Sequence, residues 1–143
     1  MSAGSTAERL LQKALRAARS ARVLLELGDV DGACNRAYYA MFDAARAALL
    51  THDPTTDPES VRTHRGMLRA FSDELVKPGR VSVELGRTLR RAESIRLVAD
   101  YRSDSVELSD ASRLVDEADV FMTTLRSEFA SNTLDGRRDT RGS

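Results

Sequence analysis

The chain has one cysteine, three prolines and no tryptophan among its 143 residues. The single cysteine, Cys34, cannot form a disulfide within the chain, nor can it alone supply the thiolates of a structural zinc site. With eight glycines and three prolines, the chain also has too few helix breakers for a disordered or collagen-like protein. Disulfide-rich, zinc-thiolate and fibrous classes are therefore excluded.

Long apolar runs are missing as well. No stretch approaches the ~18 apolar residues that a membrane-spanning helix needs, and the first residues lack the basic and then apolar order of a signal peptide. We therefore expect a cytoplasmic protein that does not enter a membrane. Hydrophobic residues make up 41% of the chain, which provides material for a core, and the length suits a single domain.

Basic and acidic residues are equal in number, 22 of each, which argues against a protein coated in basic surface. They are unevenly distributed, however. Residues 61–102 include ten basic and five acidic residues, whereas residues 103–136 include two basic and eight acidic residues. Such a dipolar chain could offer phosphates a basic face, attract a copy of itself or a partner, or simply carry solvated helix faces.

Apolar residues recur in steps of three and four along most of the chain, and no segment alternates as a strand does. We therefore expect an all-α fold, an antiparallel bundle of about five helices. The first helix is predicted over residues 5–27, from a capping box formed by Ser5 and Glu8 to a stop at Gly28. The second is predicted over residues 30–51, after an Asp29 cap, with two apolar faces that require cover on more than one side.

The remaining helices are predicted near residues 59–76, from a Ser82 cap to residue 101, and after a Ser109 cap. Prolines and a polar composition place a loop at residues 52–58. We assign residues 1–131 to the helical domain. Residues 132–143 have few apolar anchors and are predicted to form a flexible C-terminal tail.

Several kinds of catalytic machinery are absent from the sequence. A di-iron bundle needs Glu-x-x-His pairs, but the residues three before His52 and His64 are Leu49 and Val61. There is no glycine-rich phosphate loop, no Gly-x-Ser-x-Gly elbow and no His-Glu-x-x-His. We therefore expect no cofactor and no metal site, and Cys34 is predicted to fill space in the core.

Three sequence strings follow one another along the chain. They are NRAYYAMFDAARA at 35–47, THRG at 63–66 and RLVADY at 96–101. Together they resemble HEPN domains, and the resemblance extends to about Phe129. It is closest to the stand-alone bacterial and archaeal HEPN proteins whose genes lie beside minimal nucleotidyltransferases. The resemblance implies a helical bundle that forms a homodimer, and many such relatives are metal-independent ribonucleases with toxin–antitoxin, defence or stress roles.

Active HEPN ribonucleases carry an arginine followed, four to six residues later, by a histidine near the dimer cleft. Arg96 matches the arginine, but the three possible histidine positions hold Tyr101, Arg102 and Ser103. The resemblance therefore gives Arg96, Asp100 and Tyr101 as candidate catalytic residues. In this interpretation Arg96 binds a phosphate, Asp100 orients the guanidinium or phosphate, and Tyr101 supplies a hydroxyl.

The alternative for this segment is structural. Glu93, Arg96 and Asp100 lie three and four residues apart, so they are predicted to form a ladder of ion pairs on one helix face. Tyr101 has a further possible role implied by the resemblance, because in some related pairs the nucleotidyltransferase attaches AMP to a tyrosine close to the motif. Tyr101 is thus the AMP-modification candidate.

Candidate residues for binding RNA phosphates are Arg36, His64, Arg65 and Arg69, since His64 and the arginines beside it share a helical segment. His64 is alternatively a hydrogen-bonded packing residue. The aromatic residues Tyr38, Tyr39 and Phe42 are predicted to form core or dimer contacts more readily than base-stacking platforms.

These observations favour a toxin-like HEPN protein paired with a minimal nucleotidyltransferase antitoxin, which binds RNA and cleaves it without a metal. The alternatives are a catalytically inactive binding module that docks the nucleotidyltransferase and is AMP-modified on Tyr101, or a purely structural helical adaptor.

Overall fold

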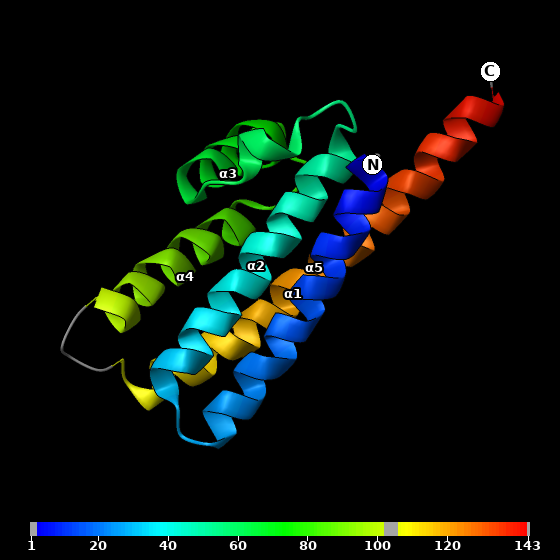
Figure 1. The fold of residues 1–143 in the computed structure, drawn as a ribbon. Helices are drawn as coiled ribbons and strands as arrows, with labels where there is room; N and C mark the ends of the chain where they lie inside the picture. Colours follow the sequence, from blue (N-terminus) through cyan, green and yellow to red (C-terminus); the bar gives the residue numbers. More distant parts are fainter. Residues whose placement is uncertain (1–2, 102–105, 143) are drawn as a thin grey trace.

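The computed structural model describes the backbone of residues 3–101 and 106–142 and the side chains of residues 6–101 and 106–129. Over these residues the chain forms helices joined by turns, with no strand (Figure 1). The elements are α1 (Ala3–Glu26), α2 (Val30–His52), the 3-10 helix η1 (Pro58–Val61), α3 (His64–Ala70), the π-helix η2 (Phe71–Val76), α4 (Val83–Tyr101) and α5 (Leu108–Gly142). The prediction of an all-α bundle of about five helices is confirmed.

The helix α2 is the centre of the bundle, because α1, α4 and α5 all pack on it (Figure 1). Most of its residues between 33 and 50 are buried, and many of them are alanines. Short alanine side chains let neighbouring backbones approach closely. The prediction that this helix is covered on more than one side is confirmed. Cys34 is fully buried in this core, and burial raises the pKa of its thiol to about 11.

The turn between α1 and α2 follows the predicted signals. Gly28 adopts a φ of +83°, a backbone conformation that favours glycine, and the side chain of Asp29 accepts a hydrogen bond from the Gly32 amide at 3.0 Å. The predicted start of α1 is wrong by two residues. The helix already includes Ala3, so Ser5 lies inside the helix and is not its cap. Gly4, directly before Ser5, lies within the helix, because a single glycine disfavours a helix by only about 1 kcal/mol.

The third predicted helix is divided into three elements. Thr63 is extended, with a ψ of 153°, and its hydroxyl accepts a hydrogen bond from the Gly66 amide at 3.0 Å, so η1 ends before it and α3 begins after it. At Phe71 the helix widens into the π-helix η2. Phe71 is buried there against Phe121 of α5, with ring centroids 5.9 Å apart. One continuous helix over residues 59–76 is therefore not observed.

The last two helices agree with their apolar patterns. The Ser82 hydroxyl accepts a hydrogen bond from the Leu85 amide at 3.2 Å, which confirms the predicted cap of α4. The helix α5 begins earlier than predicted, because the Glu107 carbonyl accepts a hydrogen bond from the Ala111 amide and Ser109 lies inside the helix. Of the predicted tail, residues 132–142 continue α5 beyond the bundle (Figure 1). The flexibility of this segment stays a prediction.

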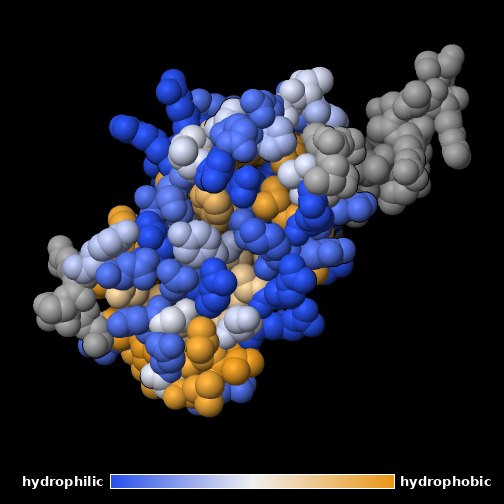
Figure 2. Space-filling view, viewed as in Figure 1, coloured by the Kyte–Doolittle hydropathy of each residue, from blue (hydrophilic) through white to orange (hydrophobic). Residues whose placement is uncertain are grey.

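The molecular surface in Figure 2 is largely hydrophilic, with an apolar patch at the end of the bundle where α1 joins α2. Val23 and Leu27, which precede this turn, are both exposed. Within the described part of the chain, no helix combines the length and the apolar character needed to cross a bilayer. The same residues contain no group of three or more histidine, cysteine, aspartate or glutamate side chains able to hold a metal ion.

Candidate active site on α2, α3 and α4

The candidate site is organised around Tyr38, a residue of α2 that is fully buried. Tyr39 and Phe42 lie on the same part of α2, and their rings contact each other edge to face at 6.0 Å between centroids. A buried tyrosine hydroxyl requires a hydrogen-bond partner. The residues that contact the Tyr38 ring and hydroxyl therefore define the candidate site.

The first of these residues is His64, which the Thr63 cap places at the first position of α3. The His64 Nδ1 atom lies 2.7 Å from the Tyr38 hydroxyl oxygen, a short hydrogen bond. The imidazole also contacts the rings of Tyr39 and Phe42, with centroid distances of 5.8 and 4.8 Å. Three aromatic rings from α2 therefore fix the orientation of the His64 ring.

The second residue is Arg96 of α4, whose guanidinium carbon lies 5.1 Å from the centroid of the Tyr38 ring. Arg96 is only 7% exposed. Its Nη1 atom donates a hydrogen bond to Asp100 Oδ2 at 3.0 Å, and the same carboxylate accepts long hydrogen bonds from Asn35 Nδ2 at 3.4 and 3.5 Å. A buried guanidinium is thus held between a carboxylate and an aromatic face.

We call the group that these contacts define the Tyr38 cluster. Its members are Asn35, Tyr38, Tyr39, His64, Arg96 and Asp100. The cluster joins α2, α3 and α4, so residues from three separate parts of the sequence meet in one place (Figure 1).

Burial and charge determine the protonation states in the cluster. Burial lowers the pKa of His64 below its usual value, the positive charge of Arg96 lowers it further, and the Glu93 carboxylate opposes this change. Burial also raises the pKa of Tyr38, so its hydroxyl stays protonated. For Arg96, burial acts to lower the pKa, but the hydrogen bond to Asp100 and the neighbouring tyrosines outweigh it and the pKa is raised. At neutral pH the cluster therefore holds a neutral imidazole beside a guanidinium cation.

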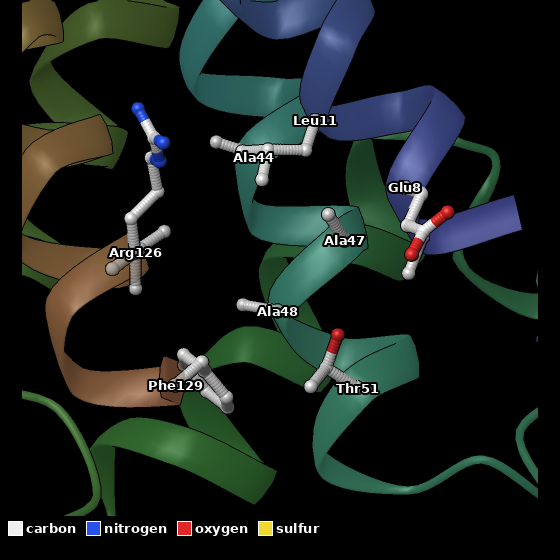
Figure 3. A pocket seen from close by; sticks show the side chains of 10 residues that line it. Glu8, Leu11, Ala44, Ala47, Ala48, Thr51, Arg126 and Phe129 are labelled. Carbon is white, nitrogen blue, oxygen red and sulfur yellow. The ribbon is translucent and has the colours of Figure 1, made fainter. Parts of the chain in front are cut away.

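A separate groove of about 270 Å³ lies between α1, α2 and α5 (Figure 3). Leu11, Ala44 and Phe129 line it with carbon atoms, while the charged ends of Glu8 and Arg126 point away from its centre (Figure 3). None of the predicted site residues lines this groove. The Tyr38 cluster, which combines a histidine, an arginine and a carboxylate, is therefore the stronger candidate for a chemical role.

The sequence of the chain can be compared with those of known proteins. The model of the HEPN domain matches residues 7–128 of the chain. The chain belongs to the HEPN family. The resemblance of the three strings is therefore confirmed, and the match covers the bundle from α1 to the part of α5 that packs on α2.

Similar proteins come from bacteria and archaea. A UPF0332 protein of Gloeobacter violaceus is 32% identical over 115 residues, which cover 79% of this HEPN chain and 87% of that protein. Two proteins of Methanocaldococcus jannaschii, each named a putative toxin, are also similar. One is 29% identical over 134 residues, covering 92% of this chain and 88% of the relative, and the other is 30% identical over 107 residues, covering 75% and 76%.

Of the three candidate catalytic residues, two are in direct contact in this HEPN domain. Arg96 and Asp100 form the ion pair described above, whereas Tyr101 is the last residue of α4 and is 77% exposed. Tyr101 still lies close enough for its side chain to help raise the pKa of Arg96. The predicted ladder is incomplete, because Glu93 makes no ion pair within the described residues and its Oε2 atom is buried without a hydrogen-bond partner.

The four candidate phosphate-binding residues lie in different surroundings. His64 belongs to the Tyr38 cluster, and the guanidinium carbon of Arg36 lies 5.4 Å from the Tyr39 ring centroid, so Arg36 adjoins the cluster. Arg65 is exposed and forms no ion pair with any described residue. Arg69 forms an ion pair with Asp73, with 3.9 Å between Arg69 Nε and Asp73 Oδ2. Arg36 and His64 are therefore the two that the structure brings together.

Sequence reasoning did not select Tyr38 or Asn35 as site residues. Tyr38 was expected as a core or dimer contact, and it is indeed fully buried. The signal that could have identified it is chemical: a buried phenol needs a partner, and His64 is one of only two histidines in the chain. Asn35 was noted only as the first residue of the sequence at 35–47.

Proposed function

We propose that this HEPN protein is the toxin-like member of a HEPN/nucleotidyltransferase toxin–antitoxin pair, and that it binds RNA and cleaves it without a metal ion. Family membership and the names of two relatives, which contain the word toxin, support the toxin-like role. The observation that supports the chemistry best is that a nearly buried arginine and a neutral histidine contact the same tyrosine ring.

RNA carries its own nucleophile, the ribose 2′-hydroxyl, so cleavage without a metal requires only proton transfer and stabilisation of charge on the phosphate. Arginine suits the second task, because its planar guanidinium matches the oxygens of a phosphate. Arg36, Arg65 and Arg96 lie in or beside the part of the fold that holds His64. We assign phosphate binding to these guanidiniums.

Cleavage of a broad panel of RNAs by the purified protein in the presence of EDTA tests this function. We expect cleavage by the wild-type chain and a loss of at least about a hundredfold in Arg96→Ala, because a positioned charge is removed from the phosphate. Arg87→Ala is the matched control, since Arg87 lies on α4 in an exposed ion pair with Glu84. If folded wild-type protein cleaves none of these RNAs, the proposal is contradicted.

The second candidate function is an inactive HEPN module that docks the nucleotidyltransferase and receives AMP on Tyr101. The strong exposure of Tyr101 at the end of α4 favours this alternative. In the transfer, the Tyr101 oxygen would bond to the α-phosphorus of ATP, pyrophosphate would leave, and the phenolic proton would pass to solvent.

Intact-mass measurement after incubation with the nucleotidyltransferase, ATP and Mg²⁺ tests the modification. We expect one added AMP on the wild type and on Tyr39→Phe, and none on Tyr101→Phe. Tyr39 is the suitable control because it is half-buried in the cluster. An added mass that persists in Tyr101→Phe would reject this assignment.

We further propose that two copies of the chain associate through α4. Leu97 and Tyr101 lie four residues apart on this helix, one turn from each other, and both are exposed beside the buried Arg96. An apolar pair next to the candidate site is suited to contact with the same surface of a second copy.

A further inference from the structure

We propose that His64, held by Tyr38, is the residue that takes the proton from the ribose 2′-hydroxyl during RNA cleavage; this inference rests on the function proposed above. Residues 101–103, where an active HEPN ribonuclease would carry its histidine, contain none. His64 comes instead from the start of α3, and both His64 and Arg96 contact the Tyr38 ring.

The geometry leaves one nitrogen of His64 available. Nδ1 is engaged with the fully buried Tyr38 hydroxyl at 2.7 Å. Nε2 forms no hydrogen bond with the described residues, and His64 as a whole is half-buried, not fully enclosed. The imidazole is therefore anchored through Nδ1, and Nε2 is the nitrogen left for a substrate.

The Tyr38 hydroxyl can accept from or donate to Nδ1, so this hydrogen bond is compatible with both neutral tautomers, and the proposed step uses the one with hydrogen on Nδ1. In the tautomer with hydrogen on Nδ1, that N–H donates to the Tyr38 oxygen and Nε2 keeps its lone pair. The charged neighbours of the ring are Arg96 and Glu93, both from α4, and the α2 side contributes the uncharged rings of Tyr38, Tyr39 and Phe42. Burial and the Arg96 cation favour the neutral imidazole, the form that accepts a proton.

The proposed step begins when the 2′-hydroxyl oxygen attacks the adjacent phosphorus. Its proton moves to His64 Nε2, the bond between phosphorus and the 5′-oxygen breaks, and the 5′-oxygen takes a proton from water. The products are a 2′,3′-cyclic phosphate and a 5′-hydroxyl, and the imidazolium returns its proton to solvent. Arg96 would stabilise the negative charge on the phosphate oxygens. Tyr38 is a positioning residue, because it acts through His64.

The alternative is that His64 only packs against α2, and a histidine substitution distinguishes the two. We expect His64→Gln to reduce EDTA-resistant cleavage about a hundredfold or more, in the range for loss of a general base. His52→Gln, which changes the other histidine, should leave the rate unchanged. Circular dichroism and the thermal midpoint of each variant establish that it folds, and an RNA gel shift establishes that binding persists.

The pH dependence tests the positioning role of Tyr38. Tyr38→Phe keeps the ring but removes the oxygen that accepts from Nδ1–H. We expect the acidic limb of the rate profile, and the His64 pKa measured by NMR, to move to lower pH, because the imidazolium loses its acceptor. The Nε2 nitrogen-15 shift of the wild type should show an unprotonated nitrogen at neutral pH.

The outcomes separate the two proposals. If the wild type cleaves RNA and folded His64→Gln cleaves at the same rate, the role of His64 is overturned while the proposed function stands. If the folded wild type cleaves no RNA, the proposed function fails and the role of His64 fails with it. An NMR pKa of His64 that is unchanged in Tyr38→Phe would overturn the positioning role of Tyr38 alone.

Discussion

The Tyr38 ring contacts two basic side chains of different character. It meets Arg96, which stays charged although it is almost fully buried, and it also meets His64, which burial keeps neutral. A buried cation is tolerated only when a partner compensates its lost hydration, and Asp100 is that partner. The guanidinium in turn disfavours protonation of the imidazole, so the two basic side chains can stay close together.

This arrangement predicts a pH dependence of stability that comes from His64. The pKa of His64 is lowered in the folded protein, whereas in the unfolded chain it lies near the ordinary value of about 6.5. As the pH is lowered, the unfolded state therefore binds the proton before the folded state does. With respect to His64, the free energy of unfolding is highest above about pH 6.5 and decreases as the pH falls below that value. Urea unfolding at pH 7.5, 6.5 and 5.5 should show this decrease.

His64→Gln should make the same curve flatter, while His52→Gln should keep the wild-type slope because His64 remains. The measurement stops at pH 5.5, since burial raises the pKa of Asp43 and that carboxyl contributes a slope of opposite sign at more acidic pH. A wild-type slope equal to that of His64→Gln would contradict the lowered pKa of His64.

At the scale of the elements, the position of His64 depends on the break between η1 and α3. Gly66 lies in the first turn of α3, close to the backbone of η1. A Cβ atom at this position would lie 2.8 Å from the Ser60 carbonyl oxygen and 2.8 Å from Thr63 Oγ1. The first of these atoms belongs to the backbone, so it cannot move without moving η1.

Gly66→Ala should therefore destabilise the protein, by about 1–3 kcal/mol as expected for an overpacked site, although alanine is the better helix former. Gly86→Ala in α4 is the matched control. Its Cβ would lie 3.2 Å from a Val76 methyl group, which can adjust, so we expect a change within about 1 kcal/mol of wild type. Chemical denaturation of the three proteins measures the difference, and equal stability of the two variants would contradict the proposed clash.

The elements differ in how far the sequence alone could define them. Asp29 and Ser82 were recognised as helix caps because capping depends on a few neighbouring residues. The division of residues 59–76 was not predicted, since the π-helix at Phe71 accompanies packing on Phe121, far along the chain. The start of α1 was wrong because a good capping residue also fits inside a helix.

The same distinction applies to the candidate site. The contact of Arg96 with Asp100 follows from a spacing of four residues on one helix, so the sequence was sufficient to predict it. The contact of His64 with Tyr38 joins α3 to α2 through the path of the intervening loop. Helical periodicity says which face a residue occupies, but it does not say which distant residue meets that face.

At the scale of the whole molecule, the uneven charge of the sequence is partly neutralised within the bundle. Arg22 of α1 lies within ion-pair distance of Asp116 and Asp119 of α5, and Arg91 of α4 pairs with Glu117 at 2.6 Å. These acids already have partners inside the chain. Charge attraction between the acidic and basic parts is therefore a weak basis for association of two copies, and an apolar contact is the stronger one.

The exposed end of α4 supplies such a contact, and its dimer is directly testable. Leu97 is 41% exposed and lies next to Arg96, whereas Val83, at the other end of the same helix, is 57% exposed. If two copies meet at Leu97, burying both side chains contributes about 3 kcal/mol, so Leu97→Glu should weaken dimerisation by at least about a hundredfold. Val83→Glu adds the same charge to α4 without touching this surface.

Light scattering coupled to size-exclusion chromatography at micromolar concentration distinguishes the species. We expect a mass of twice 15.7 kDa for the wild type and for Val83→Glu, and 15.7 kDa for Leu97→Glu. A dimer that survives Leu97→Glu but not Val83→Glu would move the interface to the other end of α4, away from the Tyr38 cluster. A monomeric wild type would remove the second copy from the proposed function and leave the cluster to act within one chain.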